Sequence, residues 1–131
     1  MNLQPLTEGQ LIDLFTETCA VEEVRQSDMD AALAFLEPLR TKHPVYREHY
    51  LHSLRVALYA RAFGSLWELD DMLGTLDPRA LLLAGALHDI GKVQVPLEVL
   101  GKTGEWTDSD QRLVRRHVVD GYRVLRGRFD F

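Results

Sequence analysis

Three histidines and one aspartate have the residue types expected of a metal site. His52, His88 and His117 fall on predicted inward faces of three different helices, and Asp89 directly follows His88. Polar side chains that converge inside a fold are costly unless they share a partner, and a metal ion is such a partner. Imidazole and carboxylate ligands suit zinc, iron or manganese, and an aspartate can bridge two ions. Buried histidines are more often hydrogen-bonded core residues, so their spacing alone leaves that alternative open.

The elements that must position these side chains are helices, because helical periodicity describes nearly the whole chain and no long stretch alternates like a strand. We predict an all-α fold of about five to seven helices. Thr7 with Gln10 has the pattern of a capping box that begins the first helix. Ser27 or Asp28 is the predicted N-cap of the second helix.

The third predicted helix is the longest and carries the first of the metal candidates. Apolar residues and histidines recur in it at steps of three and four and predict one inward stripe that stops near Gly64. The stripe consists of Val45, His49, His52, Val56, Tyr59 and Phe63.

The dipeptide Asp77-Pro78 predicts the beginning of another helix, with an N-cap followed by proline at the first helical position. This helix is expected to end near Asp89, with Gly91 as its C′ terminator. A short extended piece is predicted over 93–95.

Pro96 is predicted to open one helical turn, and Thr107 with Asp110 to cap a final helix. The apolar and small residues of this last helix are expected to share one face with its histidine. They are Leu113, His117, Gly121 and Val124.

Composition indicates one globular domain and excludes several function classes. The chain has 131 residues, 46% of them hydrophobic, and a formal net charge of −5, which argues against binding a nucleic acid polymer. It has no basic leader and no apolar run long enough for a bilayer, so we expect no membrane association and a cytoplasmic location. Cys19 is the only cysteine, which suits a reducing compartment, and its ordinary role is that of a small buried hydrophobe. A glycine-rich phosphate loop and a Ser-His-Asp arrangement are both missing, so kinase and serine-hydrolase functions have no support.

Four short motifs in the chain resemble, in order, the first half of the HD-GYP branch of the HD superfamily of metal-dependent phosphohydrolases. The motifs are His52-Ser-Leu-Arg-Val-Ala, His88-Asp-Ile-Gly-Lys-Val-Gln-Val-Pro, Leu100-Gly-Lys-Thr-Gly-Glu-Trp-Thr and His117-Val-Val-Asp-Gly. The resemblance covers about residues 45 to 126. We therefore divide the chain into an HD-type metal-binding unit over 45–131 and N-terminal helices over 1–44 that cover the core or contact a partner.

The resemblance implies a role for each matching metal candidate. His52 matches the first histidine ligand, and His88 and Asp89 match the pair that names the family, with Asp89 as the bridge between two ions. His117 matches a ligand of the second ion. Glu48 matches an additional acidic ligand of some family members, although a solvated helix carboxylate is the alternative. The metals expected are iron or manganese, with zinc, nickel or magnesium as alternatives.

The same resemblance implies hydrolysis of a phosphodiester by a metal-activated water, with Asp89 and Lys92 as the catalytic residues. Lys92 matches the lysine that steadies a substrate phosphate, and Lys102 matches the pattern with weaker implications, a loop lysine being its alternative. His49 is a reserve ligand or a core histidine. The substrate implied is a cyclic dinucleotide such as cyclic di-GMP, or another nucleotide phosphate.

The chain departs from the family pattern after His117. It lacks the further histidine ligands, the Gly-Tyr-Pro motif and the final aspartate, so it is either a fragment of a longer protein or a degenerate domain. The rival function is therefore an incomplete HD module that serves signalling or protein contacts. Apolar surface is expected at Val114, Val118 and Leu125, which predicts a homo-oligomer or a partner that covers the C-terminal helix.

Overall fold

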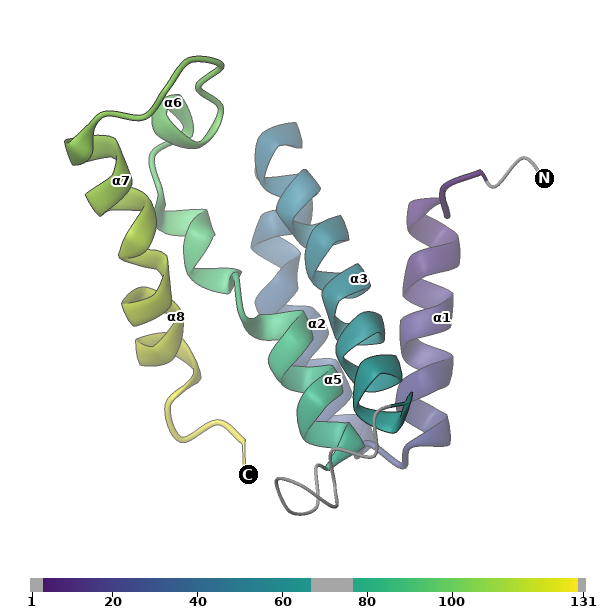
Figure 1. Ribbon diagram of the computed structural model, residues 1–131. Coiled ribbons are helices and arrows are strands. Elements are labelled where there is room, and N and C mark those ends of the chain that lie inside the picture. The colour runs from purple at the N-terminus through teal and green to yellow at the C-terminus, as the bar shows by residue number, and fades with distance from the viewer. Residues whose placement is uncertain (1–3, 67–76, 130–131) are drawn as a thin grey trace.

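The computed structural model describes residues 4–66 and 77–129 (Figure 1). Within these ranges the chain forms α-helices and one 3₁₀ helix and contains no strand, which confirms the predicted all-α class. The elements are α1 (Glu8–Val21), α2 (Gln26–Thr41), α3 (Pro44–Leu66), α5 (Pro78–Leu87), η1 (Ile90–Gln94), α6 (Leu97–Leu100), α7 (Asp108–Arg115) and α8 (His117–Leu125).

Helix α1 begins as predicted, whereas α2 begins earlier. The Thr7 hydroxyl accepts a hydrogen bond from the Gln10 amide at 3.1 Å, and the Gln10 side chain accepts one from the Thr7 amide at 2.9 Å, which completes the capping box. Helix α2 follows Arg25, so neither Ser27 nor Asp28 is its N-cap. Asp28 lies in the first turn instead, where its carboxylate forms an ion pair with Arg25 at 2.9 Å. Its negative charge also stabilises the helix, because the N-terminal end of the helix dipole is positive.

The buried face of α3 is displaced from the predicted stripe. Tyr46, Tyr50, Leu54 and Ala57 are buried, whereas the predicted inward residues further along the helix are exposed. Tyr59 is 70% exposed and Phe63 is 55% exposed. Tyr46, Tyr50 and Ala57 each follow a predicted inward residue by one position, about 100° around the helix, so His49 and His52 lie at the border of the core face.

Helix α5 begins at the predicted signal, and Asp77 accepts a hydrogen bond from the Arg79 amide at 2.9 Å. Its Gly85 lies against α3 so closely that a Cβ there would be 2.6 Å from the Cα of Ala57. The helix ends at Leu87, and Gly91 is not its C′ residue. Gly91 belongs to η1, which continues through Gln94, so the extended piece expected over 93–95 is largely helical.

The predicted final helix is two helices. Thr107 and Asp110 form the expected capping box of α7, but the α-helix is interrupted at Arg116 before α8 begins. Because of this break the predicted face is not continuous, and Leu113 and Val124 are exposed.

Among the described residues, one apolar core joins α1, α2, α3, α5 and η1. A second, small apolar cluster joins α6 to α7. Val114 belongs to the second cluster and is buried, contrary to its expected exposure, whereas Val118 is 62% exposed as expected. No helix in the described ranges is both long and apolar enough to cross a lipid bilayer.

Candidate metal centre

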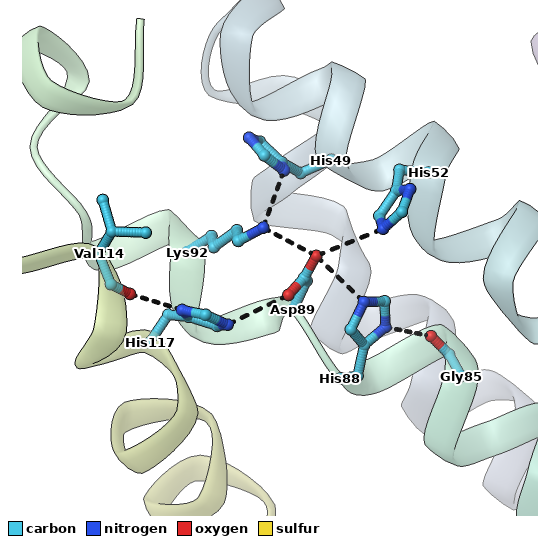
Figure 2. A network of polar contacts seen from close by, with 8 residues as sticks. All are labelled: His49, His52, Gly85, His88, Asp89, Lys92, Val114 and His117. Carbon is cyan, nitrogen blue, oxygen red and sulfur yellow. Dashed lines mark hydrogen bonds and ion pairs between the residues drawn. The ribbon is translucent and has the colours of Figure 1, made fainter. Parts of the chain in front are cut away.

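Asp89 lies at the centre of a cluster of basic side chains that come from α3, η1, α8 and the residue that follows α5 (Figure 2). It follows the end of α5, and only 3% of its surface is exposed. His52 reaches it from α3, Lys92 from η1 and His117 from the first residue of α8, while His88 is its neighbour in the chain. The structure therefore brings together the four residues whose convergence we expected from the sequence.

The two carboxylate oxygens of Asp89 face different partners. Oδ2 lies 3.1 Å from Nε2 of His88 and 3.7 Å from Nε2 of His52. Oδ1 lies 3.2 Å from Nε2 of His117. Figure 2 shows His117 on the opposite side of the carboxylate from His52 and His88, so the group divides into two sets of nitrogen atoms that share one aspartate.

Backbone carbonyls determine the tautomers of two of these histidines. Nδ1 of His88 lies 2.6 Å from the carbonyl oxygen of Gly85, and Nδ1 of His117 lies 2.5 Å from that of Val114. A carbonyl oxygen can only accept, so each Nδ1 carries the proton and donates it. In the neutral ring Nε2 then presents a lone pair to the Asp89 carboxylate, an arrangement that is favourable only if a proton or a metal cation lies between them.

This donor set fits a divalent metal ion. Ligand atoms of His52, His88 and Asp89 all lie within 4.8 Å of one another, close enough to share one ion. The carbonyl contacts of His88 and His117 are the outer hydrogen bonds that usually orient metal-bound imidazoles. His117 faces the second carboxylate oxygen and is available to another ion.

The electrostatics keep Asp89 ionised. Burial opposes its ionisation, but hydrogen bonds with His88 and Lys92 outweigh burial and hold the pKa of Asp89 well below its usual range. The hydrogen bond with Asp89 raises the pKa of His88. Burial lowers the pKa of His52 and of His49, which favours neutral rings. An ionised carboxylate and a neutral imidazole are the forms in which these groups bind metals.

Lys92 lies between the centre and the reserve ligand His49. Its ammonium is 3.0 Å from Oδ2 of Asp89 and 3.5 Å from Nδ1 of His49. His49 therefore contacts the lysine and is not among the clustered ligand atoms of the described residues.

Two predicted site residues lie apart from this cluster. Glu48 is exposed and does not belong to the group of ligand atoms within 4.8 Å. The ammonium of Lys102 lies 2.7 Å from the carboxylate of Asp110 in the capping box of α7, so it already has a structural partner. Their roles as metal ligand and phosphate ligand stay predictions.

Sequence reasoning missed Gly91 as a residue that places His117. A Cβ at Gly91 would lie 2.0 Å from the carbonyl oxygen of His117 and 2.8 Å from the amide nitrogen of Gly121. Only glycine lets the backbones of η1 and α8 approach this closely. The signal available in the sequence was the Gly91 that follows Asp89 by two residues, which we had assigned to a helix terminus.

The matches to known proteins are consistent with this centre. A family model described as the HD domain matches residues 50–131. The cyclic di-GMP phosphodiesterase PA4108 of Pseudomonas aeruginosa is 39% identical over 118 residues, which are 89% of this chain and 27% of that protein. The cyclic di-GMP phosphodiesterase response regulator RpfG of Xanthomonas campestris is 39% identical over 49 residues, 37% of this chain and 13% of that protein. The 3'3'-cGAMP-specific phosphodiesterase 1 of Vibrio cholerae is 40% identical over 48 residues, 37% of this chain and 11% of that protein.

The chain thus spans about a quarter or less of the length of these relatives. No solved structure matches the chain significantly.

Proposed function

The chain belongs to the HD domain family, and from this premise we propose that it is a metal-dependent phosphohydrolase that cleaves a phosphodiester bond of a cyclic dinucleotide. The relatives named above support the substrate class, because their names specify cyclic di-GMP or 3'3'-cGAMP. Iron or manganese is the metal we propose, since histidine nitrogen and carboxylate oxygen together suit such ions.

The observation that carries this proposal is the division of the Asp89 carboxylate. His52 and His88 face one oxygen and His117 faces the other, which suits a bridging carboxylate between two ions. A buried aspartate that served only as a counter-ion would need one cationic partner, and Lys92 already provides it.

Each side chain then has a defined task. His52, His88 and Asp89 would hold one ion, and His117 with the other oxygen of Asp89 would contribute to holding a second. Bound metal would supply a water activated at neutral pH and positive charge that offsets the charge on the phosphoryl oxygens. Lys92 would contact a phosphate oxygen as a point charge, because its ammonium reaches the same side of Asp89 as His52 and His88.

A second function has one specific observation in its favour. Lys92 neutralises Asp89 through a 3.0 Å ion pair without any metal, so the centre can be stable as a purely structural network. In that case the chain would be an HD module that serves signalling or protein contacts and has no catalytic turnover.

Metal analysis of the purified protein separates these functions. Protein prepared without chelator should contain close to two transition-metal ions per chain and should hydrolyse cyclic di-GMP. Asp89→Ala should lose the metal and lower turnover by at least about 100-fold, because it removes a ligand shared by both sites.

The matched control is Asp13→Ala, which removes an exposed aspartate of α1 far along the chain from the centre. It should keep metal and activity. If Asp89→Ala retained metal and turnover, the proposal would be wrong; a folded wild-type protein without metal or hydrolysis would favour the structural module.

A further inference from the structure

A cavity of about 640 Å³ lies between α5 and α8 and adjoins the metal centre. His88 lines this cavity and also faces Asp89, so the two sites share a wall. Ligand pockets for small molecules commonly have volumes of roughly 300–1,000 Å³, a range that includes this cavity.

The walls of the cavity suit a flat apolar group. Leu83 and Leu87 of α5 are buried and form its floor, while Val118 and Tyr122 of α8 stand at its rim. Tyr122 is 63% exposed, so its ring is accessible to a ligand in this cavity. An aromatic ring beside an aliphatic floor can stack a nucleobase without selecting which base it is.

A positive charge completes the lining. Arg126 follows α8 and lines the same cavity, and its guanidinium has no ion-pair partner among residues 4–66 and 77–129. A guanidinium can bind a phosphate through two parallel hydrogen bonds. A cyclic dinucleotide carries a second phosphate beyond the scissile one, and this phosphate would need such a cation.

We propose that this cavity is the subsite for one nucleoside of the substrate, with the base against Tyr122 and the flanking phosphate near Arg126. This subsite rests on the proposed phosphodiesterase function. It places the substrate on the side of the metal centre that α8 borders. Continuity with the centre through His88 and the charge of Arg126 favour a nucleotide over a covering protein segment.

Binding can be measured without catalysis, on metal-free protein in EDTA, by titration with guanosine 5′-monophosphate and with ribose 5-phosphate. The nucleotide should bind more tightly, because only it carries a base. Tyr122→Ala should weaken nucleotide binding about tenfold and leave ribose phosphate binding unchanged. Arg126→Gln should weaken binding of both.

Two further variants keep this test interpretable. Tyr122→Phe retains the ring and should bind the nucleotide like the wild type, which separates loss of stacking from loss of folding. Tyr59→Ala removes an exposed tyrosine of α3 outside this cavity and should change neither affinity.

Equal binding of the two ligands, or nucleotide binding that is insensitive to Tyr122→Ala, would overturn the proposal. So would a dimer in sedimentation that dissociates in Tyr122→Ala, because a second copy would then occupy the cavity. None of these outcomes affects the metal content of the wild-type protein, so failure of the subsite and failure of the phosphohydrolase function are distinguishable.

Discussion

Proton positions on two imidazole rings give the centre its capacity for metal binding. Because carbonyl oxygens of Gly85 and Val114 accept the Nδ1 protons of His88 and His117, both Nε2 atoms point at Asp89 as potential ligands. A ring that turned away would lose its hydrogen bond to the backbone carbonyl. The two histidines are therefore oriented before any ion binds, and each is oriented toward a different oxygen.

Because His88 and His117 face different oxygens of Asp89, mutation can test the contribution of each histidine to metal binding separately. His88→Ala and His117→Ala should each lower the metal content from about two ions per chain to about one, because each removes a ligand from one side of Asp89. Metal analysis by mass spectrometry measures this, and His43→Ala, an exposed histidine before α3, should retain the full content. If either single variant lost all metal, the two sides would not be independent sites.

Ionisation of Asp89 makes the stability of the metal-free protein depend on pH. The pKa of Asp89 is well below its usual range in the folded state, because the hydrogen bonds with His88 and Lys92 outweigh burial. In the unfolded chain an aspartate titrates near about pH 3.9. The native state therefore binds fewer protons, and the stabilisation is fully present above about pH 4 and is lost as the pH falls toward the native pKa.

Urea unfolding in EDTA tests this dependence. At pH 7, Asp89→Asn should lower the free energy of unfolding by about 1–3 kcal/mol, the usual cost of losing hydrogen bonds to a charged group. The difference from the wild type should shrink below about pH 4. A difference that stayed constant down to pH 3 would contradict this linkage, and Asp13→Asn is the exposed control.

At the level of helices, two glycines allow four elements to meet at the centre. Gly85 brings α5 against α3, and Gly91 brings η1 against the first turn of α8. The first contact places His52 near His88, and the second places His117 near Asp89. The geometry of the centre therefore depends on helix separations that a single methyl group would change.

Gly91→Ala should detach α8 from the centre. The added Cβ would lie 2.0 Å from the carbonyl oxygen of His117, so the first turn of α8 must move. We expect a loss of about 1–3 kcal/mol of stability from overpacking and loss of the ion that depends on His117, while the ion held by His52 and His88 is retained.

Thermal unfolding and metal analysis measure these two effects. Gly104→Ala is the matched control, because a Cβ there meets nothing within 4 Å. It should leave both quantities unchanged. Normal metal content in Gly91→Ala would show that α8 can adjust without moving His117.

At the scale of the whole molecule, helices α1 and α2 share one core with α3 and α5. Phe15, Cys19 and Leu36 are completely buried in this core. The unit boundary that we placed at residues 44 and 45 stays a prediction, but the packing indicates that the N-terminal helices and the metal-bearing helices unfold together. Cys19 is a suitable probe, because it lies on α1 and is buried in the core that α1 shares with α3 and α5.

Cys19 should be unreactive until the molecule unfolds. Burial raises the pKa of Cys19 to about 11, and the thiolate is the reactive form. At pH 8 the native protein should show no thiol reactive toward a disulfide reagent, and protein in guanidinium chloride should show one per chain. Asp13→Cys, with an exposed thiol, should react at once; rapid reaction of native wild-type Cys19 would mean that α1 opens independently.

Much of this protein could be predicted from local sequence signals. The all-α class and the caps at Thr7, Asp77 and Thr107 were predicted correctly, because a capping side chain acts within three residues of itself. The cluster of histidines around Asp89 was expected from residue types and helical periodicity. Their roles as metal ligands remain predictions.

Tertiary structure alone decided which oxygen of Asp89 each histidine faces, that Lys102 pairs with Asp110, and that Glu48 lies outside the cluster. It also placed Tyr59 at the surface and gave Gly91 its contact with His117. These features depend on distances between helices that are far apart in the chain. Periodicity reports which residues share a face of one helix, and only packing determines what that face meets.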